Sequence, residues 1–336
     1  MKKVSIIVPA YNAHNTLSRC LETLVHQTLQ DIEIIVINDA STDDTWKIMQ
    51  EYETKYPDKI IIINCEKNSR AGGARNIGFD MATGEYIGMV DSDDYVATNM
   101  YAQLYAKATE TGADIVDSGY YNESIDKAIL TTSDELTGVL DDSKRSRLIV
   151  GSGYLVTKIF KQELFNNPPV RMQANMVALE DFEILIYMFL KAQSVATVKS
   201  VFYNYCDTAN SGSKVMSTDI YFDSVYRAIS GTYRLCSNLP SYIPCRPAIE
   251  YMLTALYSFC INRCLYDQII KYGGDSTKIT NYFDELGSVE RYMLQQLSKL
   301  KKEIITIPYS ENKDVQNRIS SLDIEIMKEC DRRFGK

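Results

Sequence analysis

Three carboxylates lie within four residues directly after the apolar stretch 86–90: Asp91, Asp93 and Asp94. Crowded carboxylates repel one another unless a group of opposite charge lies between them, and a hard divalent cation is the simplest such group. Mg²⁺ and Mn²⁺ both suit one or two carboxylates completed by water and phosphate oxygens. A solvated turn is the alternative for an isolated Asp-x-Asp. A calcium loop of the EF-hand type fits poorly, because its sixth position, Val96, is not glycine.

Polar residues also follow three other apolar runs in the first part of the chain. They are Pro9, Ala10, Tyr11 and Asn12 after the first run, residues 38–43 with Asp39 after the second, and "NSRAGGARNIG", which begins at Asn68, after the third. Tyr11 presents a flat face on which a base can stack, and Asp39 can accept a hydrogen bond from the imide N–H of a base. These loops favour a nucleotide as the ligand.

The third of these loops has residues suited to phosphate. Gly72 and Gly73 would let the backbone approach a ligand closely, and Arg70 and Arg75 offer forked donors to phosphate or to a base edge. Taken singly, these residues have structural alternatives. Tyr11 could be a core aromatic, the two glycines a plain helix N-terminal turn, and Arg75 a surface helix residue.

Alternating strands and helices must position these loops. Residues 4–8, 32–37, 60–63 and 86–90 are continuous apolar runs of strand length, as in a parallel sheet covered on both faces. Between the first two runs, helical spacing is seen in Leu17, Leu21, Leu24 and Thr28. Between the next two, Ser41 and Asp44 form a predicted capping box, and Trp46, Met49 and Tyr52 follow it at helical spacing. These βαβ units predict a doubly wound α/β sheet whose ligands bind beyond the carboxyl ends of the strands, where all four loops fall.

The composition limits the class of protein. With 336 residues and 45% hydrophobic content, the chain can form one large domain and an appendage. Its net charge of −8, with acids and bases interspersed, argues against nucleic acid as a partner. The eight cysteines include no CxxC pair, which favours reduced thiols in a cytoplasmic protein. We expect neither a signal peptide nor a membrane span, because no run approaches the roughly 20 apolar residues that a span requires.

From Val4 to about Asn122 the sequence resembles the family 2 glycosyltransferases, which have the GT-A fold. It contains "SIIVPAYN", "DIEIIVINDASTDDT", "GGARNIG", "GEYIGMVDSDDY" and "GADIVDSGY" in the order of that family. The resemblance implies transfer of a hexosyl or N-acetylhexosaminyl group, with inversion, from a UDP-sugar donor to a hydroxyl of a glycan or lipid-linked saccharide. It also suggests a role in the synthesis of a bacterial capsule or other surface polysaccharide.

The resemblance further implies roles for single residues. Tyr11 and Asp39 would contact the uracil, Arg75 would hold the nucleotide side, and Asp93, assisted by Asp91, would bind Mn²⁺ or Mg²⁺ on the diphosphate. The other nucleotide-binding residues that it implies are Pro9, Ala10, Asn12, Asn68, Arg70, Gly72, Asp91 and Ser92.

The segment "MVALEDFEILIYMFLKA" is similar to the Glu-Asp-aromatic element of the family, which makes Asp181 the general base. Glu180 beside it would contact the acceptor or support the base. We expect Asp181 at the start of a helix, where the positive end of the helix dipole favours its ionised form. The apolar positions that would pack inward are Ile184, Leu185, Met188 and Phe189.

The chain departs from the family pattern after this helix. Relatives often have a histidine or an arginine there, whereas this chain reads "VFYNYCDTANSGSK". Cys206, Asp207 or Lys214 could take that place, or no residue does. The only histidines, His14 and His26, are expected as capping or surface residues. We expect the polar residues 207–214 to form a mobile segment over the donor.

Residues 1–214 are expected to form the nucleotide-sugar-binding and catalytic domain, and residues 215–336 an all-helical region. The tyrosines and "SKLKKE" of that region could bind the acceptor, the inner face of the cell membrane, or a second subunit in a homodimer; a self-contained helical cap is the simplest alternative.

Two other functions can be weighed against the motifs of this sequence. A nicotinamide dehydrogenase does not fit, because "PAYNAH" replaces the expected GxGxxG after the first strand. A catalytically inactive nucleotide-sugar-binding or scaffolding protein of the same fold remains the alternative. The presence of Asp91, Asp93 and Asp181 favours an enzyme.

Overall fold

The computed structural model describes residues 2–151, 153–208, 218–253 and 256. In this part of the chain ten strands form one sheet, with the order β3-β2-β1-β4-β9-β6-β10-β5, while β7 pairs with β6 and β8 with β10. The strands are β1 Val4–Ala10, β2 Ile32–Asn38, β3 Ile60–Asn64, β4 Tyr86–Met89, β5 Tyr95–Val96, β6 Ile115–Asn122, β7 Lys127–Ile129, β8 Gly138–Val139, β9 Lys158–Lys161 and β10 Ser194–Tyr205.

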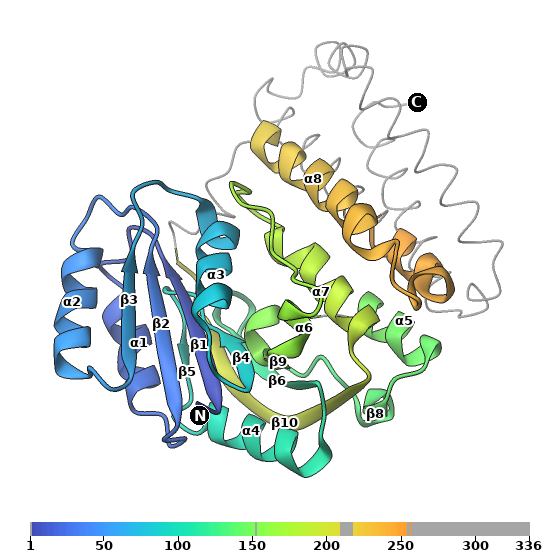
Figure 1. Cartoon of the computed structure of the whole chain (residues 1–336), viewed down its shortest axis with the longest axis horizontal. Helices are drawn as coiled ribbons and strands as arrows, with labels where there is room; N and C mark the ends of the chain where they lie inside the picture. The colour runs from blue at the N-terminus through green and yellow to red at the C-terminus, as the bar shows by residue number, and fades with distance from the viewer. Residues whose placement is uncertain (1, 152, 209–217, 254–255, 257–336) are drawn as a thin grey trace.

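Helices cover this sheet, as Figure 1 shows. The α-helices are α1 Leu17–Val25, α2 Thr45–Lys55, α3 Arg70–Met81, α4 Met100–Thr111, α5 Asp142–Val150, α6 Glu163–Asn166, α7 Glu180–Lys191 and α8 Thr218–Cys236; the 3₁₀ turns are η1 Glu123–Ile125, η2 Asp134–Leu136 and η3 Leu155–Thr157. The expected α/β class with flanking helices is confirmed.

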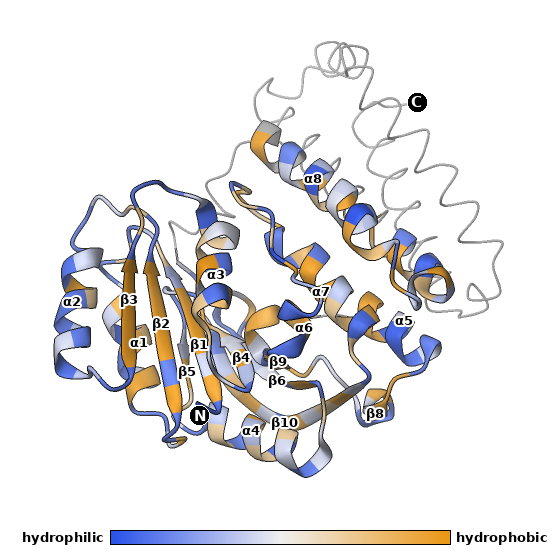
Figure 2. Cartoon of the chain, in the orientation of Figure 1, coloured by the Kyte–Doolittle hydropathy of each residue, from blue (hydrophilic) through white to orange (hydrophobic). Residues whose placement is uncertain are grey.

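The first half of the sheet is built from the predicted βαβ units. β1 runs parallel to β2 and β4, and β2 runs parallel to β3. Every residue of β1 and β2 is buried, and both strands are mainly hydrophobic in Figure 2. Continuous apolar runs therefore predicted these strands correctly, because both of their faces are covered.

The start of α2 differs from the prediction. Asp44 is the N-cap residue but makes no side-chain capping bond. Instead, Asp43 Oδ1 accepts from the backbone N–H of Thr45 at 3.0 Å, and the N–H of Ser41 donates to Asn38 Oδ1 at 3.2 Å. The predicted Ser41–Asp44 capping box is wrong, because both residues lie in a turn whose groups are satisfied by Asn38 and Asp43.

The second half of the sheet is joined to the first by β9. This strand lies between β4 and β6 and is antiparallel to both, whereas β10 is parallel to β6. It follows that β1, β4, β6 and β10 run in the same direction and end at the same edge of the sheet. Because β9 runs the other way, its first residue lies at that edge too.

The pair α7 and α8 lies on the side of the molecule away from α2 (Figure 1). Gly231 of α8 permits this approach, because a Cβ there would meet Glu183 Oε2 and Gln173 Nε2 at far less than contact distance. Residues 242–253 are also helical. The rest of the expected helical region, the boundary at residues 214 and 215, and most of the segment 207–214 lie outside the described residues, so these stay predictions.

The expected state of the cysteines is confirmed where it can be seen. Cys20, Cys65, Cys206, Cys236 and Cys245 are free thiols, and all except Cys65 are buried. No helix within the described ranges combines the length and the apolar character needed to cross a bilayer.

Candidate active site

The acidic loop 91–94 follows β4 and is fastened by the end of β10. The backbone N–H of Asp91 donates to the hydroxyl of Tyr203 at 3.2 Å. That hydroxyl donates to Asp94 Oδ2 at 2.5 Å, and the N–H of Cys206 donates to Asp94 Oδ1 at 2.8 Å. Asp94 therefore anchors the loop, and Asp91 and Asp93 are held beside it.

Burial and mutual repulsion change the acidity of this loop. Asp94 is 1% exposed, and burial together with the charge of Asp91 raises its pKa to about 8. The same two causes raise the pKa of Asp93, whose Oδ2 accepts a hydrogen bond from Thr208 Oγ1 at 2.9 Å. The loop thus crowds carboxyl groups whose ionised forms are disfavoured, and a bound cation would offset that cost by stabilising the negative charge.

Arg75 links the acidic loop to the start of α7. Its guanidinium donates from Nη2 to Asp91 Oδ1 and from Nη1 to Glu180 Oε1, each at 2.6 Å. Burial opposes the charge, but Asp91 and Glu180 raise the pKa of Arg75 above its ordinary value. Arg75 is 5% exposed, so it is not the surface residue that was the alternative. Its contact with a nucleotide stays a prediction.

Asp181 is the second residue of α7, which begins directly after Leu179. The helix prediction is confirmed, and the expected inward positions Ile184, Leu185, Met188 and Phe189 are buried. Burial and the charge of Glu180 raise the pKa of Asp181 to about 7, while Arg75 opposes the shift. Its ionised form is therefore less favoured than the dipole of α7 alone predicts. A carboxyl that titrates near neutral pH is suited to accept and release a proton.

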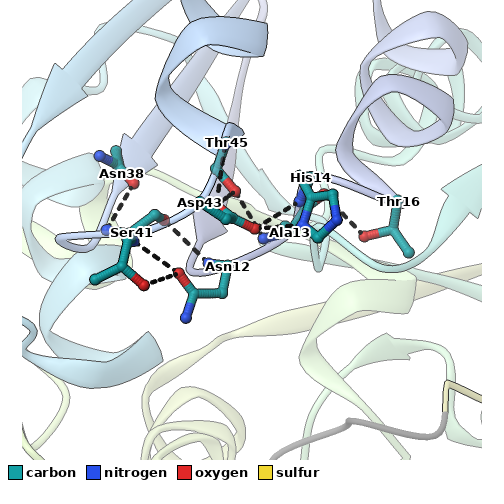
Figure 3. A network of polar contacts seen from close by, with 9 residues as sticks. Asn12, Ala13, His14, Thr16, Asn38, Ser41, Asp43 and Thr45 are labelled. Atoms are coloured by element: carbon teal, nitrogen blue, oxygen red, sulfur yellow. Dashed lines mark hydrogen bonds and ion pairs between the residues drawn. The ribbon is translucent and has the colours of Figure 1, made fainter.

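The turns after β1 and β2 are bonded to each other, as Figure 3 shows. The N–H of Asn12 donates to Ser41 Oγ at 3.0 Å, and Asn12 Oδ1 accepts from the N–H of Thr42 at 2.8 Å. His14 is exposed and pairs with Asp43, as expected of a surface histidine. The side chain of Asn12 thus fixes the shape of this part of the site.

Tyr11 and Asp39 lie at the ends of β1 and β2. Tyr11 is 46% exposed, so it is not a core aromatic and its ring is accessible for stacking. Asp39 is 2% exposed, and its Oδ1 accepts from the N–H and the hydroxyl of Ser69 at 2.7 and 3.0 Å. Asn68 Nδ2 donates to the carbonyl of Asp39 at 3.0 Å. These contacts bring the loops after β2 and β3 together.

The two glycines of α3 permit a close approach by the protein itself. A Cβ on Gly72 would lie 2.6 Å from the carbonyl oxygen of Gln173 and 3.2 Å from Glu180 Cβ, and one on Gly73 would lie 2.4 Å from Ser69 Oγ. The glycines therefore allow the start of α3 to contact the segment before α7. Their predicted approach to a ligand stays a prediction.

The remaining predicted nucleotide residues differ in accessibility. Pro9 and Ala10 are buried within β1. Arg70 is exposed and has a left-handed φ of 64°, and Ser92 is partly exposed in the acidic loop. The edge of the sheet thus brings together the ends of β1, β2 and β4 and the start of α3. The predicted contacts of Pro9, Ala10, Arg70 and Ser92 with a nucleotide stay predictions.

The residues around Asp93 fit a cation that takes most of its ligands from water and phosphate and few from the protein. Within the described ranges no three His, Cys, Asp or Glu side chains are arranged as a metal site. Burial raises the pKa of Cys206 to about 12, which disfavours the thiolate that a metal would need. The carboxyl of Asp93, which is partly exposed, fits an ion completed by water and phosphate oxygens. Lys214 lies outside the described residues.

Sequence reasoning missed Arg19 of α1. Its Nη2 donates to the carbonyl of Asp93 at 2.7 Å and to Cys206 Sγ at 3.1 Å, and its guanidinium lies 4.9 Å from the ring centroid of Tyr95. Arg19 has the spacing of an ordinary exposed helix residue. Nothing local could have identified it, because Asp93 and Cys206 lie 74 and 187 residues away in sequence.

Comparison with known proteins decides the family. Residues 5–174, half of the chain, match the family model described as "Glycosyl transferase family 2". The chain belongs to glycosyltransferase family 2. The resemblance drawn from the motifs is thereby confirmed, and transferase activity is the established activity of such a family.

Individual members of the family give further comparisons. The chain is 32% identical over 222 residues to the uncharacterized glycosyltransferase EpsJ of Bacillus subtilis, covering 63% of each protein. It is 29% identical over 208 residues to a poly(ribitol-phosphate) beta-glucosyltransferase of Bacillus spizizenii, covering 60% of this chain and 32% of that protein. The chain therefore spans less than two thirds of the length of these two relatives.

A solved structure supports the fold. The crystal structure of S. aureus TarS residues 1–349 in complex with UDP-GlcNAc superposes with a TM-score of 0.63 at 19% identity, covering 95% of this chain and 83% of that one. This likeness agrees with the GT-A architecture.

Proposed function

We propose that this family 2 glycosyltransferase transfers a hexosyl or N-acetylhexosaminyl group, with inversion, from a UDP-sugar to a hydroxyl of a glycan or lipid-linked saccharide. Its product would belong to a bacterial surface polysaccharide assembled at the cytoplasmic face of the membrane. The names of two matched proteins support this proposal, one a beta-glucosyltransferase acting on poly(ribitol-phosphate) and the other bound to UDP-GlcNAc.

The observation that carries the proposal is the bridge made by Arg75. One buried guanidinium holds Asp91 of the acidic loop and Glu180 of α7, each at 2.6 Å. This bridge sets the distance between the loop assigned to the diphosphate and the helix start assigned to the base. Direct displacement needs both groups in a fixed relation to the same sugar.

Asp181 is the proposed base that removes the proton of the acceptor hydroxyl. Its raised pKa matches a group that must be ionised before attack and protonated after it. Glu180 positions Asp181 through its own bond to Arg75. Tyr11 would stack on the uracil, and Asp39 would accept its imide N–H.

Asp93, with Asp91 beside it, would hold a Mn²⁺ or Mg²⁺ ion. When bound, such an ion neutralises the charge that develops on the departing diphosphate. Thr208 donates to Asp93 Oδ2 and so orients the carboxylate. Arg19 Nη2 donates to the backbone carbonyl of the same residue and so fixes the position of its backbone.

The test is release of UDP from a panel of UDP-sugars, measured with and without EDTA. We expect metal-dependent release by the wild type and none by Asp93→Ala, whereas Asp58→Ala, which alters an exposed aspartate in the turn before β3, retains it. Binding of UDP without turnover of any donor would support the inactive binding protein instead. Full activity of Asp93→Ala at limiting Mn²⁺ would remove that residue from the metal site.

A further inference from the structure

Three tyrosines from separate parts of the chain form an aromatic group that the proposed mechanism leaves unused. The rings of Tyr154 and Tyr205 are stacked, with centroids 6.0 Å apart and planes inclined by 5°. Tyr120 meets Tyr154 edge-on, at 5.1 Å and 84°. Tyr154 is 39% exposed, whereas Tyr120 is 7% exposed. The group therefore combines an accessible aromatic ring with a buried one that supports it. We name these three residues the tyrosine platform.

The platform lies at the same edge of the sheet as the acidic loop. Tyr120 is near the end of β6, Tyr205 is the last residue of β10, and Tyr154 precedes β9, which begins at that edge. Tyr205 is followed by Cys206, whose N–H bonds to Asp94. Burial and the charges of Asp94, Asp93 and Asp91 raise the pKa of Tyr205, which agrees with this proximity.

A buried ion pair fixes the backbone of Tyr154. Its carbonyl accepts from Lys158 Nζ at 2.9 Å. Lys158 lies 3.0 Å from Asp117 Oδ1, and neither side chain is exposed. Burying two charges costs free energy that their attraction only partly offsets. The contacts of this pair therefore give Tyr154 a fixed position although its ring is accessible.

Asp117 accepts further hydrogen bonds that fix the ion pair. Its Oδ2 accepts from the hydroxyls of Thr131 and Thr132 at 2.5 and 2.6 Å, and its Oδ1 accepts from Thr157 Oγ1 at 2.7 Å. Such a saturated network is rigid. An accessible tyrosine on a rigid support is a suitable contact surface for a ligand, because little side-chain freedom remains to be lost on binding.

We propose that Tyr154 and Tyr205 form a stacking surface for a pyranose ring of the acceptor saccharide. The C–H face of such a ring is apolar and packs on an aromatic face, while its hydroxyls remain free for polar contacts. This inference rests on the proposed function.

The order of the strands favours the acceptor over the donor. The nucleotide loops follow β1 and β2, and the acidic loop follows β4. Tyr120 and Tyr205 of the platform belong to β6 and β10, further along the same sheet, and Tyr154 precedes η3 and β9. Nucleotide, diphosphate and transferred sugar would thus lie in sequence along the edge. The acidic loop continues into β5, which pairs with β10, so the platform lies beside the diphosphate site on strands that carry none of the nucleotide loops. A saccharide that attacks the donor sugar would approach from this part of the edge.

The test uses the full chain with UDP and Mn²⁺ and a panel of p-nitrophenyl β-glycosides of glucose, galactose and N-acetylglucosamine. Saturation-transfer NMR would detect the ring protons that contact the protein. We expect Tyr154→Ala to weaken glycoside binding roughly tenfold, the scale of one aromatic contact. Tyr154→Phe keeps the ring and should retain the affinity. Tyr226→Ala, at an exposed tyrosine of α8, is the matched control.

Calorimetry with UDP separates this inference from the proposed function. Every variant should bind UDP as the wild type does, and with a turned-over donor only the KM of the acceptor should rise. Unchanged glycoside affinity in Tyr154→Ala, a raised donor KM instead, or a wild type that binds UDP but no glycoside would each overturn the platform as an acceptor site. Loss of UDP binding or of all donor turnover in the wild type would contradict the proposed function itself.

Discussion

Arg75 shows how much of the site depends on one side chain. It is buried between Asp91 and Glu180, and its Nε has no hydrogen-bond partner in the described structure. Removing one partner of a buried charge pair leaves the other uncompensated, which is costly. The acidic loop and the start of α7 are therefore coupled, so that removing Asp91 or Glu180 should also alter the position of the other.

Asp181 leads to a prediction about pH. Its pKa is raised to about 7, and only the deprotonated form can accept the proton of the acceptor. Activity should therefore rise with pH through about 7 and level off above it. Asp181→Asn should bind UDP normally but lose about 10²- to 10⁴-fold in rate. A pH profile of kcat/KM tests this, and a flat profile between pH 5 and 9 would place the base elsewhere.

Asp39 leads to a prediction about the base of the donor. Ser69 occupies Oδ1 of this buried carboxylate, so Oδ2 would face the base. Uracil offers an N3–H donor, whereas cytosine would present an unprotonated N3 to the carboxylate. An unpaired contact costs about 1 to 3 kcal/mol, so UDP should bind roughly ten- to a hundredfold more tightly than CDP.

Calorimetry with UDP, CDP and GDP in Mn²⁺ would measure this preference. GDP is the serious competitor, because guanine also presents N–H donors. Asp39→Asn keeps an oxygen for Ser69 and can turn an N–H toward the base, so it should reduce the preference for UDP over CDP. An Asp39→Asn protein that discriminates as well as the wild type would remove Asp39 from the base pocket.

Among the elements near the site, α3 closely approaches the segment before α7. A Cβ on Gly72 would lie 2.6 Å from Gln173 O and 3.2 Å from Glu180 Cβ. Gly72→Ala should lower the free energy of unfolding by about 1 to 3 kcal/mol, less the gain in helix propensity. Activity should fall further, because Glu180 moves.

Urea unfolding and UDP release measure these two effects. Gly151→Ala is the matched control, since its Cβ would lie an ordinary 3.4 Å from Arg147 O. If Gly72→Ala and Gly151→Ala behave alike, the close approach of α3 is unimportant.

The ion pair beneath η3 gives a second prediction for an element. Asp117→Ala leaves Lys158 buried without its partner and should cost about 3 to 5 kcal/mol of stability. The double variant Asp117→Val with Lys158→Met replaces the pair by apolar groups and should regain part of it, because the hydroxyls of Thr131, Thr132 and Thr157 still lose their acceptor. The double variant should still bind acceptor glycosides poorly, because Tyr154 has lost its contact with Lys158. Urea unfolding and glycoside binding that recover together would show that the pair serves stability alone.

The elements that could be predicted from the sequence are those in which a regular pattern of apolar residues matches the buried faces. Strands β1 and β2 are covered on both faces and read as apolar runs, and α7 shows a regular apolar face. Strand β9, "KIFK", was not predicted, because it is four residues long and includes a lysine whose burial depends on Asp117. The acidic loop was found from its carboxylates and their position directly after a buried strand, whereas the links made by Arg19, Tyr203 and Arg75 join residues that only the folded sheet brings together.

For the molecule as a whole, the position of β9 in the chain determines when the two parts of the sheet can be joined. β4 pairs only with β1 and β9 among the described strands, and β6 has no pairing with β4. Without β9, the sheet consists of two parts, each with an unpaired edge. Ile159 and Phe160 of β9 pair with both neighbours and are fully buried.

During synthesis, the ribosome delivers β1, β2, β3, β4 and β6 well before β9. The facing edges of β4 and β6 therefore stay unpaired for the time needed to add residues 123–161, and such edges favour association with other chains. Stalled nascent chains should become resistant to protease only after Lys161 has left the ribosome. Equal resistance in chains stalled before Lys158 emerges would show that the first half folds by itself. A four-residue strand thus sets the time at which the two parts of the sheet are first joined in each new molecule.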